Sequence, residues 1–147
     1  MYEHGLITPV VVLVAWSLII WIWMYATRMP AMTQAKIKPQ EAKHPGSLDA
    51  LPSQARQVAD NYNHLMEQPT IFYAICFALQ ALDQIQPINI GLAWAYVALR
   101  IVHSLVQCTV NIVMIRFLVF AMSTLVLMAM TVHALMGTGL IPSLVHG

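Results

Sequence analysis

Long apolar segments are the feature that most constrains the fold of this chain. Residues 5–27 contain no charged side chain, and a helix needs about 20 mainly apolar residues to cross a bilayer. Residues 88–109 and 112–136 are also apolar, with few polar interruptions. A backbone in lipid must satisfy its own hydrogen bonds, so each segment is expected to be a helix. The sequence therefore predicts an all-α integral membrane protein.

The charge content excludes several other classes of protein. Only 9% of the residues are charged and 59% are hydrophobic, whereas soluble domains carry about 25% charge. Seven basic residues against six acidic ones leave no basic surface for nucleic acid. Membrane lipid is the expected partner. Cys76 and Cys108 lie within apolar runs, which predicts buried free thiols rather than a disulfide.

A fourth helix and one long loop complete the predicted architecture. Residues 30–53 combine four prolines with charged side chains and are predicted to form a connecting loop. Residues 54–83 begin polar and end apolar, so this helix is expected to start in the interface and then cross the membrane. The predicted spans are about 5–28, 54–83, 88–109 and 112–136. They form one antiparallel four-helix bundle, which makes residues 1–147 a single domain.

Basic residues near the spans predict the orientation of the bundle. The first loop is flanked by basic residues and the third loop is followed by one, while the second loop carries none; these residues are Arg28, Lys36, Lys38, Lys43, Arg56 and Arg116. Basic loops stay in the cytoplasm. Both termini are therefore expected outside the cytoplasm.

Polar side chains form a stripe on each of the two middle helices. Arg56, Asp60, Asn63 and Glu67 are spaced four, three and four residues apart, which places them on one helical face. Arg100, His103, Gln107 and Asn111 repeat this pattern on the third helix. A charge at the centre of a span costs about 2.5–3.5 kcal/mol, so it usually faces the interior of a bundle. The stripes lie at matching depth, with Arg116 near the mouth, and predict a polar cavity open to the cytoplasm.

Structural roles are the alternatives for several of these residues. Glu67 and Arg100 could form a buried ion pair that only fixes helix register. Arg56 and Asp60 lie near the interface, where solvation explains them. His133 is expected to be a hydrogen-bonded core residue, and His64 an interfacial one. No histidine or cysteine pair has a metal-ligand spacing on one helix, so no metal site is predicted.

Three motifs follow one another along the chain: residues 61–73 (NYNHLMEQPTIFY), the Arg100-x-x-His103 pair and Arg116. Together they resemble the MAPEG family, the membrane-associated proteins in eicosanoid and glutathione metabolism. The likeness is greatest to the bacterial branch, which implies an inner-membrane protein with periplasmic termini. It also implies a homotrimer that binds glutathione between subunits, in a cleft open to the cytoplasm.

The resemblance also implies roles for individual residues. Asn63 and Glu67 match the pair that holds the glutathione backbone, while Arg100 and His103 match the motif that lines its site. Arg116 matches the arginine that stabilises the glutathione thiolate. Gln107 is assigned to the same binding site, although enzymes of the eicosanoid branch carry tyrosine at this position.

The resemblance therefore implies a glutathione transferase or peroxidase, and no metal is expected in its reaction. Its second substrate is expected to be a lipophilic electrophile or a lipid hydroperoxide that arrives from the bilayer. A non-enzymatic bundle that binds lipid or supports another membrane complex is one alternative, and Gln107 and Phe117 favour it. The other is a proton-coupled carrier in which Glu67 titrates within the membrane.

Overall fold

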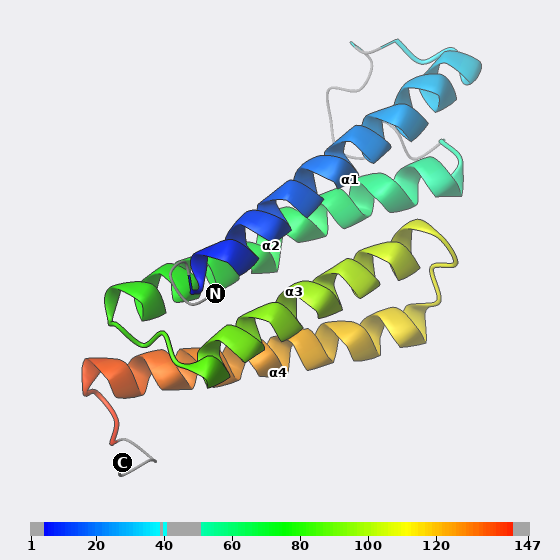
Figure 1. Ribbon diagram of the computed structural model, residues 1–147. Coiled ribbons are helices and arrows are strands. Elements are labelled where there is room, and N and C mark those ends of the chain that lie inside the picture. The colour runs from blue at the N-terminus through cyan, green and yellow to red at the C-terminus, as the bar shows by residue number, and fades with distance from the viewer. Residues whose placement is uncertain (1–4, 39, 41–50, 143–147) are drawn as a thin grey trace.

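Four helices account for most of the chain. The computed structural model describes residues 5–38, 40 and 51–142. The helices are α1 (Ile7–Gln34), α2 (Ser53–Ala81), α3 (Pro87–Cys108) and α4 (Val113–Thr138), and the described ranges contain no strand (Figure 1). The predicted all-α, four-helix fold is confirmed.

The helices form two antiparallel hairpins. α1 packs mainly on α2 and α3 packs mainly on α4, while α2 joins the hairpins through contacts with both α3 and α4 (Figure 1). The α3–α4 connection lies at the same end of the bundle as the C-terminus of α1 and the N-terminus of α2. The α2–α3 turn lies at the opposite end. This topology brings the middle parts of α2, α3 and α4 together.

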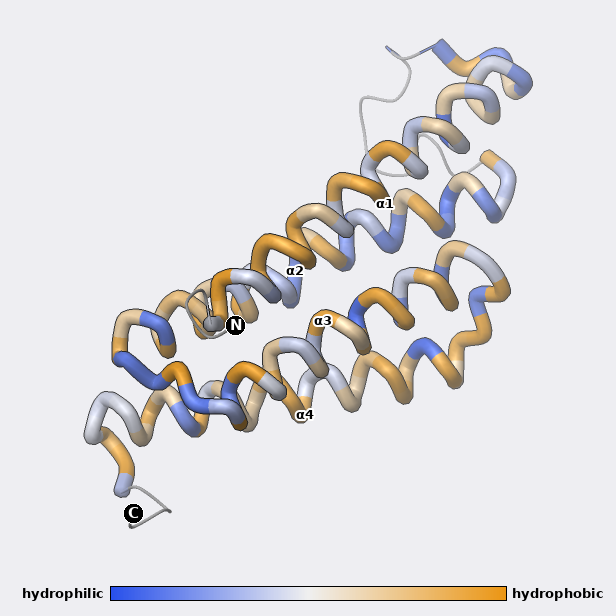
Figure 2. Tube along the Cα trace, in the orientation of Figure 1, coloured by the Kyte–Doolittle hydropathy of each residue, from blue (hydrophilic) through white to orange (hydrophobic). Residues whose placement is uncertain are grey.

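Three of the described helices are long and apolar enough to cross a membrane: α1, α3 and α4. α2 has sufficient length, but its first half carries the charged stripe that contains Arg56, Asp60 and Glu67. Figure 2 shows this contrast between the hydrophilic start of α2 and the largely hydrophobic α1 and α4. The chain is therefore an integral membrane protein.

α1 continues beyond its predicted end near residue 28 and includes Pro30. Proline inside a helix removes a hydrogen bond and costs about 3 kcal/mol. Packing offsets this cost, because buried Ala31 and Met32 form a small core with Leu51 and Ala55 at the start of α2. The predicted loop over residues 30–53 is therefore too long at its N-terminal end, while its C-terminal end agrees with the start of α2 at Ser53. Most of its centre, residues 41–50, lies outside the described residues.

The main core is apolar and lies between the hairpins. Phe72 of α2 stacks on Tyr96 of α3 with ring centroids 4.4 Å apart, and both side chains are fully buried. Cys76 and Cys108 are buried free thiols, as predicted. The core therefore fixes α2 against α3 by direct ring packing.

A polar contact closes the bundle at the α2–α3 turn. The Asn89 side chain donates to the Gln84 carbonyl at 2.8 Å, and His133 Nδ1 lies 2.6 Å from Asn89 Oδ1. His133 is thus a hydrogen-bonded structural histidine, as predicted. It lies at the opposite end of the bundle from the α3–α4 connection.

Candidate functional site

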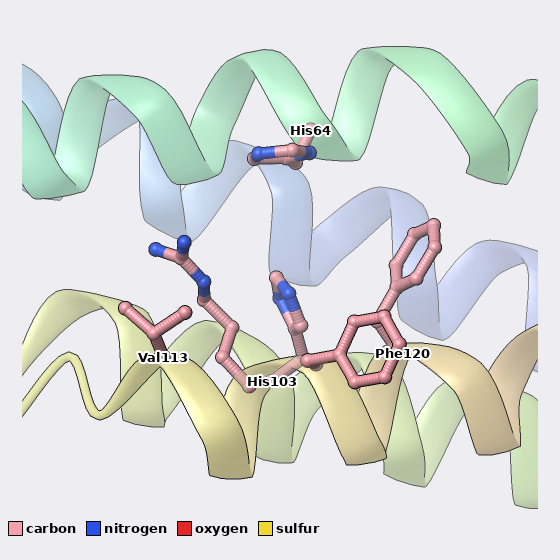
Figure 3. Close-up of a pocket in the computed structure, with 6 residues that line it drawn as sticks. His64, His103, Val113 and Phe120 are labelled. Atoms are coloured by element: carbon pink, nitrogen blue, oxygen red, sulfur yellow. The ribbon is translucent and has the colours of Figure 1, made fainter.

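A pocket of about 200 Å³ lies between α2, α3 and α4, near the α3–α4 connection. Its lining consists of His64, His103, Val113, Arg116, Phe117 and Phe120. Figure 3 shows His64 projecting from α2 toward the side chains of α3 and α4. The lining therefore combines one guanidinium and two imidazole groups with three apolar side chains of α4, a combination that suits a small anion beside a lipophilic group.

Arg116 supplies the positive charge of the pocket. Its Nη1 donates to Asn111 Oδ1 at 2.7 Å. Asn111 adopts a left-handed conformation with φ 48°, which asparagine tolerates better than most residues, and its N–H donates to the Val106 carbonyl. The end of α3 thus positions the guanidinium. Within the described part of the chain no carboxylate forms an ion pair with Arg116, so its charge is available to a ligand.

Two imidazole rings lie beside this arginine. The rings of His64 and His103 meet edge to face with centroids 6.0 Å apart, and His103 lies 6.2 Å from the Phe120 ring. His103 is 3% exposed, whereas the His64 side chain is 43% exposed, with its Nδ1 3.7 Å from Glu67 Oε2. His103 therefore belongs to the floor of the pocket and His64 to its rim.

Arg100 lies fully buried behind the pocket. Its Nη2 donates to the His64 carbonyl at 3.4 Å, and its Cζ lies 5.8 Å from the centre of the Phe120 ring. Nε and Nη1 have no hydrogen-bond partner among the described residues. Because a buried charge is costly unless it is paired, Arg100 raises the affinity of this region for an anion.

Other buried polar atoms near Arg100 also lack partners. They are Asn61 Oδ1, His103 Nδ1, Ser104 Oγ and Gln107 Oε1, counted within the described ranges. Each unpaired buried group costs about 1–3 kcal/mol. The interior at this end of the bundle therefore favours a polar ligand or solvent over a dry core.

The structure brings together only part of the predicted set. Arg100, His103 and Gln107 of α3 point inward and are 0%, 3% and 2% exposed, and Arg116 reaches the pocket from α4. Asn63 and Glu67 of α2 do not line the pocket, and the Glu67 side chain is 71% exposed.

The expectation that both stripes line one recess is therefore wrong within a single subunit. At about 100° per residue, Asn63 and Glu67 lie almost opposite the buried Leu65, Phe72 and Cys76 of α2. The apolar face of α2 packs on α1 and α3, which turns the charged stripe outward. The alternative ion pair between Glu67 and Arg100 does not form either. Among the described residues, the Glu67 carboxylate forms an ion pair only with His64.

The sequence interpretation missed His64 and the apolar wall. The sequence pattern predicts an interfacial His64, because this residue lies off the charged stripe. It borders the apolar face of α2, next to buried Asn61 and Leu65. The position of His64 beside the apolar face that carries Leu65 and Phe72 is therefore the signal that could have identified it as a pocket residue.

A protein-family model described as the MAPEG family matches residues 6–136, a range that includes every residue of the pocket. A search of curated proteins and a search of solved structures gave no match.

Proposed function

Since the chain belongs to the MAPEG family, whose model covers residues 6–136, we propose that it is a membrane-bound, glutathione-dependent enzyme of the transferase or peroxidase type. Glutathione is the proposed co-substrate, and no metal takes part in the proposed reaction. The second substrate is a lipophilic electrophile or hydroperoxide. The observation that carries the proposal is the Arg116 guanidinium, which faces a partly apolar pocket without a carboxylate partner.

The proposed role of Arg116 is to stabilise the thiolate of glutathione. A free thiol has a pKa of about 8.5, and lowering that pKa by two units requires roughly 2.7 kcal/mol of preferential stabilisation of the anion. A guanidinium keeps its charge at any physiological pH. Held by Asn111 in a partly desolvated pocket, it can supply stabilisation of this size.

The apolar wall supports a lipophilic second substrate. Phe117 is 62% exposed and Val113 is 64% exposed, so the pocket is open on a side of α4 that is otherwise apolar. A hydrophobic molecule dissolved in the bilayer can reach the thiolate from this side. The thiolate sulfur then attacks the electrophilic carbon, a C–S bond forms, and the bond to the leaving group breaks so that this group departs as an anion. The product carries glutathione in its place.

We propose that the pocket holds only the thiol end of glutathione, and its small dimensions support this. Its volume of about 200 Å³ is below the roughly 300–1,000 Å³ of ordinary ligand sites. Arg100, His103 and Gln107 provide polar groups beneath it, and Asn63 and Glu67 lie outside it on α2. The rest of the tripeptide is therefore proposed to extend over the rim formed by α2.

The outward stripe of α2 supports an oligomer. Asp60, Asn63 and Glu67 are exposed on one face of α2, and exposing charges to lipid is costly. We propose a homotrimer in which this face is covered by a neighbouring copy and contributes Asn63 and Glu67 to glutathione bound at the boundary. The proposed location is a bacterial inner membrane, with periplasmic termini and the pocket open to the cytoplasm.

Calorimetric titration of the purified protein with glutathione tests the proposal. Wild type is expected to bind glutathione and to conjugate it to chlorodinitrobenzene, while Arg116→Ala is expected to keep the fold and lose turnover. Undiminished conjugation by Arg116→Ala contradicts the role of this residue. Absence of both heat and conjugation in the folded wild type instead favours a non-enzymatic lipid-binding protein, for which the apolar wall is the supporting observation.

A further inference from the structure

His64 occupies a position in the pocket that the thiolate role of Arg116 does not explain. It is the residue through which α2 reaches the pocket, and it lies across from Phe120 of α4. Arg116 lines the same pocket. Stabilising a thiolate requires a fixed positive charge, which Arg116 already provides. A second, proton-carrying group is needed only when the reaction produces a basic leaving group.

The surroundings of His64 suit proton transfer. Its side chain is 43% exposed, so it can exchange protons with water, and Glu67 Oε2 lies 3.7 Å from its Nδ1. The carboxylate lies on the Nδ1 side of the ring. The second ring nitrogen, Nε2, is therefore left for a ligand. The other charged or titratable groups near it are His103 and Arg100 of α3 and Arg116 of α4.

His103 is less suited to this role. It is only 3% exposed, and its ring lies between those of His64 and Phe120. A group that gives up a proton in each turnover must regain it, and burial beneath two rings restricts this exchange. Of the two imidazoles, the structure favours the one at the rim.

We infer that His64 is a catalytic acid which makes the pocket a site for lipophilic hydroperoxides, with Glu67 as the residue that positions it. This inference rests on the proposed function. The apolar wall formed by Val113, Phe117 and Phe120 receives the organic group, and the peroxide oxygens lie between Arg116 and His64.

The reaction balances with glutathione as the only reductant. The thiolate sulfur attacks the terminal peroxide oxygen, an S–O bond forms, the O–O bond breaks, and its electron pair leaves on the alkoxide oxygen. His64 donates a proton to the alkoxide and releases the alcohol. Sulfur is oxidised to a sulfenic acid and the peroxide is reduced. A second glutathione condenses with the sulfenic acid to give the disulfide and water, and the thiol of the next glutathione returns a proton to His64.

Comparing two reactions of the same thiolate tests whether His64 donates a proton to the leaving group. Conjugation of chlorodinitrobenzene releases chloride, which needs no proton, whereas reduction of cumene hydroperoxide releases an alkoxide, which does. At saturating glutathione, His64→Gln is expected to lower the ratio of hydroperoxide reduction to conjugation by at least about tenfold, since general acids typically contribute more than this. The matched control is His133→Gln at the far end of the bundle, which should leave the ratio unchanged.

The outcomes separate the inference from the proposed function. Equal loss of both reactions in His64→Gln, or a wild type that conjugates but reduces no cumene hydroperoxide, overturns the role of His64 and leaves the transferase proposal standing. A folded wild type with neither reaction overturns the proposed function itself. If His64→Gln does not fold, Glu67→Gln provides the test. In this variant the ratio of hydroperoxide reduction to conjugation must also fall at saturating glutathione. An unchanged ratio rejects the inference.

Discussion

Arg116 is the side chain on which the proposed chemistry depends most. Replacing it with alanine removes the charge that would stabilise the thiolate, and a loss of roughly 2.7 kcal/mol corresponds to about a hundredfold lower turnover. Arg116→Lys keeps a charge but loses the planar group held by Asn111, so its turnover should lie between those of wild type and Arg116→Ala. Steady-state rates with chlorodinitrobenzene measure this order. Rates of Arg116→Lys and Arg116→Ala that both equal the wild-type rate would show that the charge is irrelevant.

Gln68 is expected to hold the helices together beside the pocket. Its Nε2 donates to Thr124 Oγ1 of α4 at 2.9 Å, and its Oε1 accepts from the Tyr96 hydroxyl of α3 at 3.1 Å. Gln68→Met removes both hydrogen bonds, each worth roughly 0.6 kcal/mol within a membrane, and leaves the buried tyrosine hydroxyl unpaired. The free energy of unfolding in mixed detergents should fall.

The exposed Gln54 on the same helix provides the control for this change. Gln54→Met alters composition in the same way without breaking a described hydrogen bond. Its unfolding free energy should match that of wild type. If both variants unfold alike, the Gln68 contacts contribute nothing to the assembly of α2 with α3 and α4.

The residues of the site could be predicted from the sequence only where polarity and burial coincide. On α3, Arg100, His103 and Gln107 share the face of the buried Ala93 and Tyr96, so the polar stripe and the inward face are the same. On α2 the charged stripe and the inward face lie on opposite sides of the helix. The polar residues that matter inside the bundle, Asn61 and Gln68, lie among its apolar positions, where a search for charge overlooks them.

At the scale of elements, the start of α1 is fixed by a close contact with the α2–α3 turn. Gly5 has φ 40°, and a Cβ there would lie 2.4 Å from Ile85 Cγ2, while the Leu6 N–H donates to Gln80 Oε1. Gly5→Ala should therefore lower the thermal midpoint. Gly91→Ala is the matched control, because nothing lies within 4 Å of its added Cβ and alanine favours a helix interior. A Gly5→Ala midpoint as high as that of Gly91→Ala would refute this contact.

The helices were predictable because the length of an apolar segment is a direct physical requirement for crossing lipid. The end of α1 was not predictable from local sequence, because proline usually marks a helix boundary and Pro30 lies inside α1. Packing between distant segments overrides this rule, in a small core formed by Ala31, Met32, Leu51 and Ala55. Contacts between segments distant in sequence are not visible in either segment alone.

At the scale of the whole molecule, the charged face of α2 predicts association. A monomer in a bilayer would leave Asp60 and Glu67 exposed at a cost of a few kcal/mol each if they faced lipid. Native mass spectrometry of detergent-solubilised protein is expected to show three copies. A monomer as the only species, stable over a range of mild detergents, would contradict the proposed homotrimer and the shared glutathione site.

The central claim is that the pocket stabilises the thiolate of glutathione beside Arg116. The most direct measurement is the ultraviolet absorbance of the thiolate when glutathione is added to the purified protein near neutral pH. Wild type is predicted to give a saturable increase in thiolate absorbance that is absent in Arg116→Ala. Glutathione that binds to wild type without any increase, or an equal increase in both proteins, would contradict the claim.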